Sequence, residues 1–291
     1  MHTIEFPHNN KRLYMPSHLG ECDNNQFAHM CYLMFQYQNK EITLQQFKYN
    51  AVYQLLNLEP INKSKLNKIE AEKKEANILL LSEELESFFS TNEDNQIYIK
   101  QEFTKNPMPY IPLLKGKLKG PKDNFEDMTF GQYLDALDIF GNFVKEPETE
   151  LIYDLCATLY QKGVYNKDDV PKIKKTLKNN FFGYVYGAYI IFTTFQHTIN
   201  NSLIMVEGNL CDLSILYKKS EGQKKYTNLP NLGMKSVAFT LAESGVFGDY
   251  NEVRNSPLWE ILARLYDMRV RDLEEEARQK EQEKKIKSKK R

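Results

Sequence analysis

The chain has 291 residues, enough for one large or two modest domains that each bury a core of their own. Lysine plus arginine and aspartate plus glutamate each total 39, so the formal net charge is zero and gives no general attraction to nucleic acid or membranes. The four cysteines are scattered without a paired spacing, and the first residues lack the basic and apolar parts of a signal peptide. These features argue against a disulfide scaffold and favour a protein of the reducing cytoplasm with buried thiols.

Residues 1–60 predict an N-terminal helical hairpin. Pro7 and Pro16 favour extended turns at the start of the segment. Through residues 24–37 the apolar side chains recur at helical spacing. After a polar break, Thr43 can cap a second helix whose apolar positions would pack against the first.

Residues 61–123 predict a linker helix followed by an extended arm and a loop. Residues 61–76 carry mainly lysine, glutamate and asparagine, which indicates a solvated linker or the exposed start of a helix. Residues 97–99 alternate with polar neighbours and the proline-rich NPMPYIP follows, so a short strand or extended arm is expected near 95–112. The glycine, lysine and proline residues of 115–123 predict a loop, and they lack the spacing of a phosphate-binding loop.

Residues 124–270 predict the main helical domain. Asp127 or Thr129 can cap its first helix, which Gly141 should interrupt. A further helical repeat of apolar residues is expected to end at Gly163, because glycine favours the left-handed conformation that closes many helices.

The longest apolar tract is FFGYVYGAYIIFTTF, residues 181–195, within a stretch that has no charged residue from 179 to 206. The tract is shorter than the roughly 20 apolar residues that a membrane-spanning helix needs. It therefore predicts a central helix that is buried on all sides. Gly183 and Gly187 would allow another helix to approach this one closely.

The last third of the chain predicts an exposed loop and a long helix. Residues 217–235 are polar and rich in turn residues, which predicts the loop. Ser256 followed by Pro257 predicts the start of the helix, and residues 271–291 form a charged tail expected to be an exposed helix that frays. The whole pattern predicts a mainly α fold, an irregular multi-helix bundle with helical hairpins.

Three residue patterns could support metal binding or catalysis. The first comprises His18, Cys22, His29 and Cys31, whose spacing matches no common zinc pattern. The second pairs Cys156 or Cys211 with His197, but both cysteines lie among apolar residues, where a thiol is usually inert. The third is Asp135 with Asp138, for which a solvated helix face is a better interpretation than an acid–base pair. We therefore predict no catalytic, cofactor or metal residue and do not expect an enzyme.

Four segments of the chain carry a family resemblance. In MTFGQYLDALDIF, 128–140, Thr-Phe-Gly is followed by a glutamine, an aromatic residue, an aliphatic residue and an aspartate. Leu159 and Tyr160 and then the aromatic tract come next, followed by LAESGVFGDYNEVRNSPLWEILARLYDMR, 241–269. The opening YMPSHLGECDNNQFAHMCYLMF combines a proline with a helical hairpin. In content and order these segments resemble tail-assembly chaperones and baseplate-hub assembly proteins of tailed phages and prophages.

The resemblance implies a helical protein that holds or orders tail components in the host cytoplasm, and that could remain in the virion. Its expected partners are other phage tail or structural proteins and further copies of itself, with no cofactor. Residues of the two motif segments are the candidates for contact with partners: Phe130, Gly131, Tyr133, Phe247, Trp259, Leu262 and Leu265.

Two alternatives belong to other functional classes. A nucleic-acid-associated regulator would use the lysine-rich end KKIKSKKR, although the acidic residues just before it offset its field. A hydrolase would use Cys156 or Cys211, and alkylation of the thiol would inactivate it.

Overall fold

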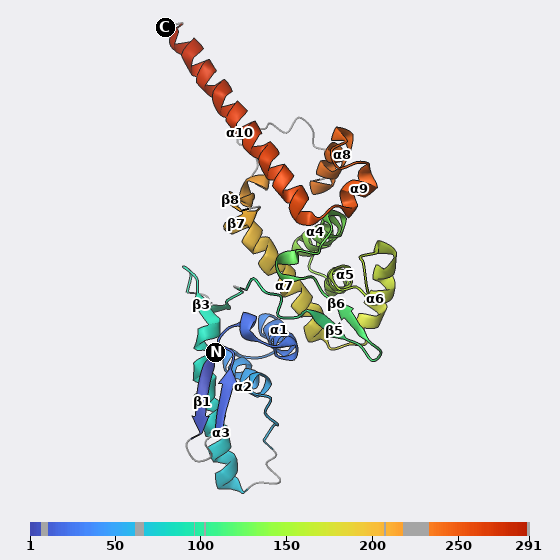
Figure 1. Ribbon diagram of the computed structural model, residues 1–291. Coiled ribbons are helices and arrows are strands. Elements are labelled where there is room, and N and C mark those ends of the chain that lie inside the picture. The colour runs from blue at the N-terminus through green and yellow to red at the C-terminus, as the bar shows by residue number, and fades with distance from the viewer. Residues whose placement is uncertain are drawn as a thin grey trace. The chain divides into compact units, whose positions relative to one another are not determined.

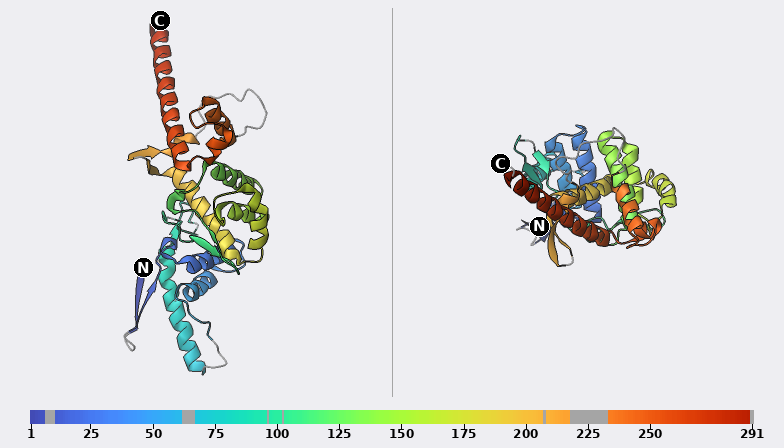
Figure 2. Two further views of the ribbon diagram at one scale, coloured as in Figure 1. Left: turned by 45° about the vertical axis from the view of Figure 1, so that its right-hand side comes forward. Right: turned by 90° about the horizontal axis from the view of Figure 1, so that it is seen from above.

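The fold is mainly α, as predicted. The computed structural model describes residues 1–6, 11–61, 67–95, 97–101, 103–206, 208–217 and 233–289 (Figures 1 and 2). Within these ranges the α-helices are α1 (Asn24–Gln38), α2 (Leu44–Leu55), α3 (Lys68–Glu83), α4 (Phe130–Lys145), α5 (Thr149–Leu159), α6 (Val170–Leu177), α7 (Phe182–Asn201), α8 (Met234–Ser244), α9 (Tyr250–Asn255) and α10 (Leu258–Lys289).

The strands of the described residues form short antiparallel pairs. They are β1 (His2–Phe6) with β2 (Lys11–Met15), β3 (Phe89–Thr91) with β4 (Ile97–Ile99), β5 (Tyr110–Pro112) with β6 (Lys117–Lys119), and β7 (Leu203–Val206) with β8 (Asn209–Asp212). The predicted strand near 95–112 is thus present as β4 and β5. The start of the chain forms the β1–β2 hairpin where extended turns were expected, because its two halves satisfy each other's backbone groups.

The chain separates into two compact units. Unit 1 comprises residues 1–124 and 136–194, and unit 2 comprises residues 125–135 and 195–291. The segments predicted from the sequence have bounds at residues 60, 123 and 270, and these bounds stay a prediction. Periodicity identifies a helix but does not show which core each of its ends joins, and both α4 and α7 contribute residues to both units.

In unit 1, α1 and α2 form the predicted helical hairpin. The Asp23 side chain accepts hydrogen bonds from the backbone N–H groups of Asn25 and Gln26, and the Gln26 side chain accepts one from the Asp23 N–H. Thr43 and Gln46 make the same reciprocal cap at the start of α2. These caps satisfy amides that have no partner inside the helix, and so fix where each helix begins.

The predicted linker and loop of unit 1 are more ordered than the sequence indicated. Asn67 and Glu70 cap α3, so the polar stretch contains the exposed start of a helix. The segment 115–123, predicted as a loop, contains strand β6. Its Lys119 exchanges two backbone hydrogen bonds with Gln161, of 2.7 and 3.0 Å, and a local sequence pattern cannot show this distant partner.

The aromatic tract forms α7, most of which is buried as predicted. A Cβ on Gly183 would lie 2.2 Å from the Ala28 carbonyl oxygen of α1, so the glycine is needed for this close helix approach. Gly187 makes room for Met108 and Phe27 in the same way. No helix among the described residues is long and apolar enough to cross a membrane.

Two predicted helix ends are wrong. Gly141 does not interrupt α4, which continues to Lys145, because one glycine inside a helix costs only about 1 kcal/mol. The next helix ends at Leu159, before Gly163. Tyr160 leaves the helix in an extended conformation, and its buried hydroxyl donates to the Met108 carbonyl at 2.7 Å.

Unit 2 contains α8, α9 and α10 (Figure 1). Most of the predicted loop 217–235 lies outside the described residues. Helix α10 begins at Leu258, directly after Ser256 and Pro257, as predicted, and the Ser256 hydroxyl donates to the Glu252 carbonyl of α9. The charged tail is helical to Lys289 where fraying was expected, and pairs such as Lys285 with Glu281, four residues apart, support the helix.

Candidate protein-binding groove

The two motif segments pack against each other inside unit 2. The Phe130 N–H donates to the Ser256 carbonyl, and the Leu258 N–H donates to the Met128 carbonyl, both at 2.9 Å. The Thr129 hydroxyl accepts from the Gln132 N–H at 3.2 Å and so caps α4, as predicted. We call this contact, between residues 128–135 and 249–262, the motif junction.

A glycine and an ion pair define the centre of the motif junction. A Cβ on Gly131 would lie 2.8 Å from the Arg254 carbonyl oxygen, so only glycine allows this approach without a shift. Four residues later on the same helix face, Asp135 accepts a 2.6 Å hydrogen bond from the Arg254 guanidinium. The same guanidinium donates to the Gly131 carbonyl at 3.3 Å.

The environment of this pair differs from the solvated helix face predicted for Asp135 and Asp138. The Asp135 side chain is only 8% exposed, and that of Arg254 is 20% exposed. Asp138 is exposed, as predicted. Burial disfavours the charged form of Arg254, but the Asp135 carboxylate and the hydrogen bond with Tyr250 together outweigh this effect and raise the pKa of Arg254. The prediction failed for Asp135 because its partner lies 119 residues away in the sequence.

The seven contact candidates fall into an enclosed and an accessible set. Phe130, Tyr133 and Leu262 have no exposed surface, and Gly131 is buried. Phe247, Trp259 and Leu265 are partly exposed. The enclosed side chains belong to the core of unit 2. Only Phe247, Trp259 and Leu265 among the seven candidates are therefore accessible for direct contact with a partner.

Hydrogen bonds and aromatic packing around Tyr133 stabilise the interior of unit 2. Its hydroxyl lies 2.8 Å from the hydroxyl of Tyr217 and 3.4 Å from the Gln196 side-chain oxygen. Burial raises the pKa of Tyr133, so the phenol stays neutral and can donate a hydrogen bond. Phe195 packs edge-on against both Tyr133 and Trp259.

Beside the motif junction, α8 and α10 leave an open hollow that we call the α8–α10 groove. Its volume is about 240 Å³. Its apolar lining comes from α8, α10 and the short helix η6 (Leu213–Leu216), and comprises Leu216, Met234, Val237, Leu241, Leu265 and Met268. Its polar lining comprises Ser236, Thr240, Arg269 and Asp272.

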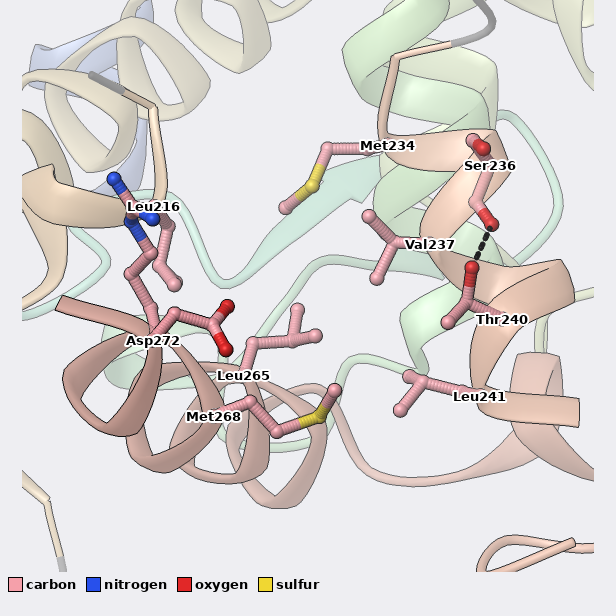
Figure 3. Close-up of a pocket in the computed structure, with 10 residues that line it drawn as sticks. Leu216, Met234, Ser236, Val237, Thr240, Leu241, Leu265, Met268 and Asp272 are labelled. Carbon is pink, nitrogen blue, oxygen red and sulfur yellow. Dashed lines mark hydrogen bonds between the residues drawn. The ribbon is translucent and has the colours of Figure 1, made fainter. Parts of the chain in front are cut away.

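Figure 3 shows how these side chains meet. Met234, Val237 and Leu241 project from α8 toward Leu265 and Met268 of α10. Apart from the buried Leu241, all these apolar side chains are only half-buried, so the groove presents apolar surface to solvent. The Thr240 hydroxyl is used within its own helix, where it donates to the Ser236 carbonyl at 3.2 Å. The groove thus offers mainly apolar contact, with charge at its α10 end.

The β7–β8 hairpin is a second apolar surface of unit 2. Met205 and Leu210 face each other across its two strands, and they are 61% and 63% exposed. Leu203, on the same face as Met205, is 65% exposed. Exposed apolar residues that cluster in this way mark surfaces for contact with other molecules.

The candidate metal ligands and thiols can be located among the described residues. Across the described ranges, no cluster of three or more histidine, cysteine, aspartate or glutamate side chains could hold a metal ion. Burial raises the pKa of the Cys22, Cys31 and Cys156 thiols, which keeps them in the unreactive neutral form.

The remaining cysteine and the candidate base are each engaged locally. The Cys211 thiol lies 3.6 Å from the Asn209 carbonyl oxygen. The His197 ring lies 3.3 Å from the Asn201 amide on the next turn of α7. Neither contact couples a thiol to a base.

The sequence carries a signal for each of the two groove walls, since both are apolar helix faces. Met234, Val237 and Leu241 are spaced three and four apart, as are Leu265, Met268 and Asp272, so each set occupies one helix face. These two faces do not close completely against each other. That gap depends on tertiary packing, so residue spacing alone does not predict it.

Comparisons of the chain with protein-family models, curated proteins and solved structures find no match.

Proposed function

We propose that this chain is a phage tail morphogenesis protein, a tail-assembly chaperone or a minor tail-side structural subunit, that acts by binding other proteins. It would act in the host cytoplasm during assembly, and a subunit of this kind would remain in the virion. The α8–α10 groove is the site that we assign to partner binding.

The observation that carries the proposal is the position of the groove relative to the residues that resemble tail-assembly proteins. Residues 241–269 supply one side of the motif junction and, through Leu241, Leu265 and Met268, part of the groove lining. Residues 241–269 therefore pack into the interior of unit 2 on one side and line the open apolar groove on the other. This arrangement is what we expect of a fold that presents a binding surface.

The groove lining also indicates the chemistry of the partner. Flexible methionine side chains can adapt to different apolar shapes, and Met234 and Met268 face each other across the hollow. Asp272 and Arg269 provide charged groups where a polar end of the bound segment would lie. We infer that the occupant is an amphipathic helix of a tail protein, which inserts its apolar face as helices do in other hydrophobic grooves.

Binding without catalysis is the companion proposal. The buried neutral thiols and the local engagement of His197 support it, because nucleophilic catalysis requires a thiolate beside a base.

The direct experiment is co-expression with the tail proteins encoded by neighbouring genes. We expect at least one of them to co-purify with the chain or to gain solubility in its presence. If every neighbouring tail protein behaves the same with and without the chain, the proposal is wrong.

A further inference from the structure

Unit 1 contains a larger hollow of a different character, which we call the tyrosine pocket. Its volume is about 510 Å³, within the range of small-ligand sites. It is lined by one face each of α1 and α2, by the residues just after α2, by α3 and by Phe181. All the lining residues named below belong to unit 1, so the pocket is independent of the α8–α10 groove.

Aromatic rings line the pocket in two groups. His29 and Tyr32 of α1 both pack against Phe181. Their ring centroids lie 4.7 and 5.2 Å, respectively, from the centroid of the Phe181 ring. Tyr49 and Tyr53 from α2 form the other group, with centroids 5.3 Å apart and hydroxyls 3.1 Å apart. All five rings are half-buried, so each keeps some accessible surface.

No lysine or arginine is among the described lining residues. Glu75 of α3 is the one formally charged side chain among the described lining residues. Burial lowers the pKa of His29, so its imidazole is mainly uncharged near neutral pH and does not repel a cation. Burial, helped by the hydrogen bond to Tyr49, raises the pKa of Tyr53, which therefore remains a neutral phenol.

The faces of aromatic rings carry negative electrostatic potential and attract cations within about 6 Å of the ring centroid. We propose that the tyrosine pocket binds an organic cation, an ammonium or guanidinium group, between the α1 and α2 rings. The hydroxyl pair of Tyr49 and Tyr53 provides oxygen acceptors for its N–H groups. Such a cation could be the side chain of a lysine or arginine on a partner protein or a free small amine, and both share this chemistry.

The test is an NMR titration of the full chain with labelled tyrosine. The probes are N-acetyl-lysine methylamide, its uncharged norleucine analogue and methylammonium. We expect the cations to shift the ring signals of Tyr49 and Tyr53 and the norleucine compound to leave them unchanged. Shifts with the lysine compound alone indicate a peptide-borne cation, and shifts with methylammonium alone indicate a free amine. Equal shifts with norleucine, or none with either cation, would overturn the proposal.

Variants separate ring chemistry from loss of structure. Replacing Tyr49 with leucine should weaken cation binding roughly 2- to 30-fold, while Tyr49→Phe, which keeps the ring, should lose much less. Glu75→Gln should weaken it by up to about fivefold. Tyr98→Leu is the matched control, because Tyr98 is 50% exposed on β4 and does not line the pocket. If Tyr49→Leu folds normally and binds the cation as tightly as Tyr49→Phe, the rings are not the site.

Discussion

The motif junction and the α8–α10 groove lie in the same unit and share α10, yet they differ in how completely they are packed. At the junction, the Gly131 backbone touches that of Arg254, and a nearly buried carboxylate meets its guanidinium. In the groove, apolar side chains of two helices face each other across an open hollow. The contrast separates residues that make the fold from residues that remain available for a partner.

This difference gives the two regions different mutational signatures. Changes at the junction should lower the free energy of unfolding, because they leave buried groups unpaired or crowded. Changes in the groove should leave folding nearly intact and remove binding. Three pairs of variants test this separation, and a deletion tests the alternative function.

The largest effect is expected from Asp135→Ala, which leaves the Arg254 guanidinium partly buried without its carboxylate. We expect a loss of about 3 kcal/mol or more in the free energy of unfolding, measured by urea denaturation. Asp138→Ala, at an exposed position on the same helix, is the control and should change it by less than about 0.5 kcal/mol. Equal losses in the two variants would show that the ion pair does not stabilise the junction.

A second pair compares two glycines of α4. Gly131→Ala should destabilise the chain by about 1–3 kcal/mol, because the new methyl group would lie 2.8 Å from the Arg254 carbonyl oxygen. Gly141→Ala should stabilise it by about 0.5–1 kcal/mol, because the added carbon would meet no described atom beyond its own stretch of helix within 4 Å, and alanine favours a helix. Thermal denaturation should show a lower midpoint for Gly131→Ala and a higher midpoint for Gly141→Ala. A lower midpoint in both variants would contradict the packing described for α4.

A third pair compares an enclosed and an accessible residue of α10. Leu262→Ala should cost about 2–5 kcal/mol, because Leu262 has no exposed surface and its truncation leaves a cavity. Met268→Ala, on the groove wall, should cost less than about 1.5 kcal/mol, because the side chain already meets solvent. Denaturation midpoints that fall equally would mean that the groove belongs to the core.

The smallest effect is expected from removing residues 284–291, the lysine-rich end. The Lys285 ammonium pairs with Glu281, so the acidic residues of α10 offset part of the basic charge. We expect no change in the salt at which the chain leaves a nucleic-acid column. Elution at markedly lower salt after the deletion would favour the nucleic-acid regulator instead.

Much of the helical architecture could be predicted from the sequence. Apolar spacing and capping residues located α1, α2, α7 and α10 because these signals act within a few residues. Gly183 was correctly associated with a close helix approach. The β1–β2 and β5–β6 hairpins were not recognised as hairpins, because strand pairing depends on a partner segment and not on local preference alone.

The candidate sites were less predictable than the helices. The motif segments drew attention to Phe130, Gly131 and Tyr133 as contact residues, whereas the structure encloses all three. The partner of Asp135 and the opening between α8 and α10 arise from contacts between residues distant in sequence. Spacing shows which residues share a helix face, but not whether that face is covered.

The most direct test of the account is co-purification of a tail protein with groove variants. Met268→Asp places a charge on the groove wall, and Leu273→Asp places one on the same helix at an exposed residue outside the lining. We predict that both variants fold, that Met268→Asp loses the tail protein and that Leu273→Asp retains it. Retention of the tail protein by a folded Met268→Asp variant would contradict the assignment of the groove as the binding site.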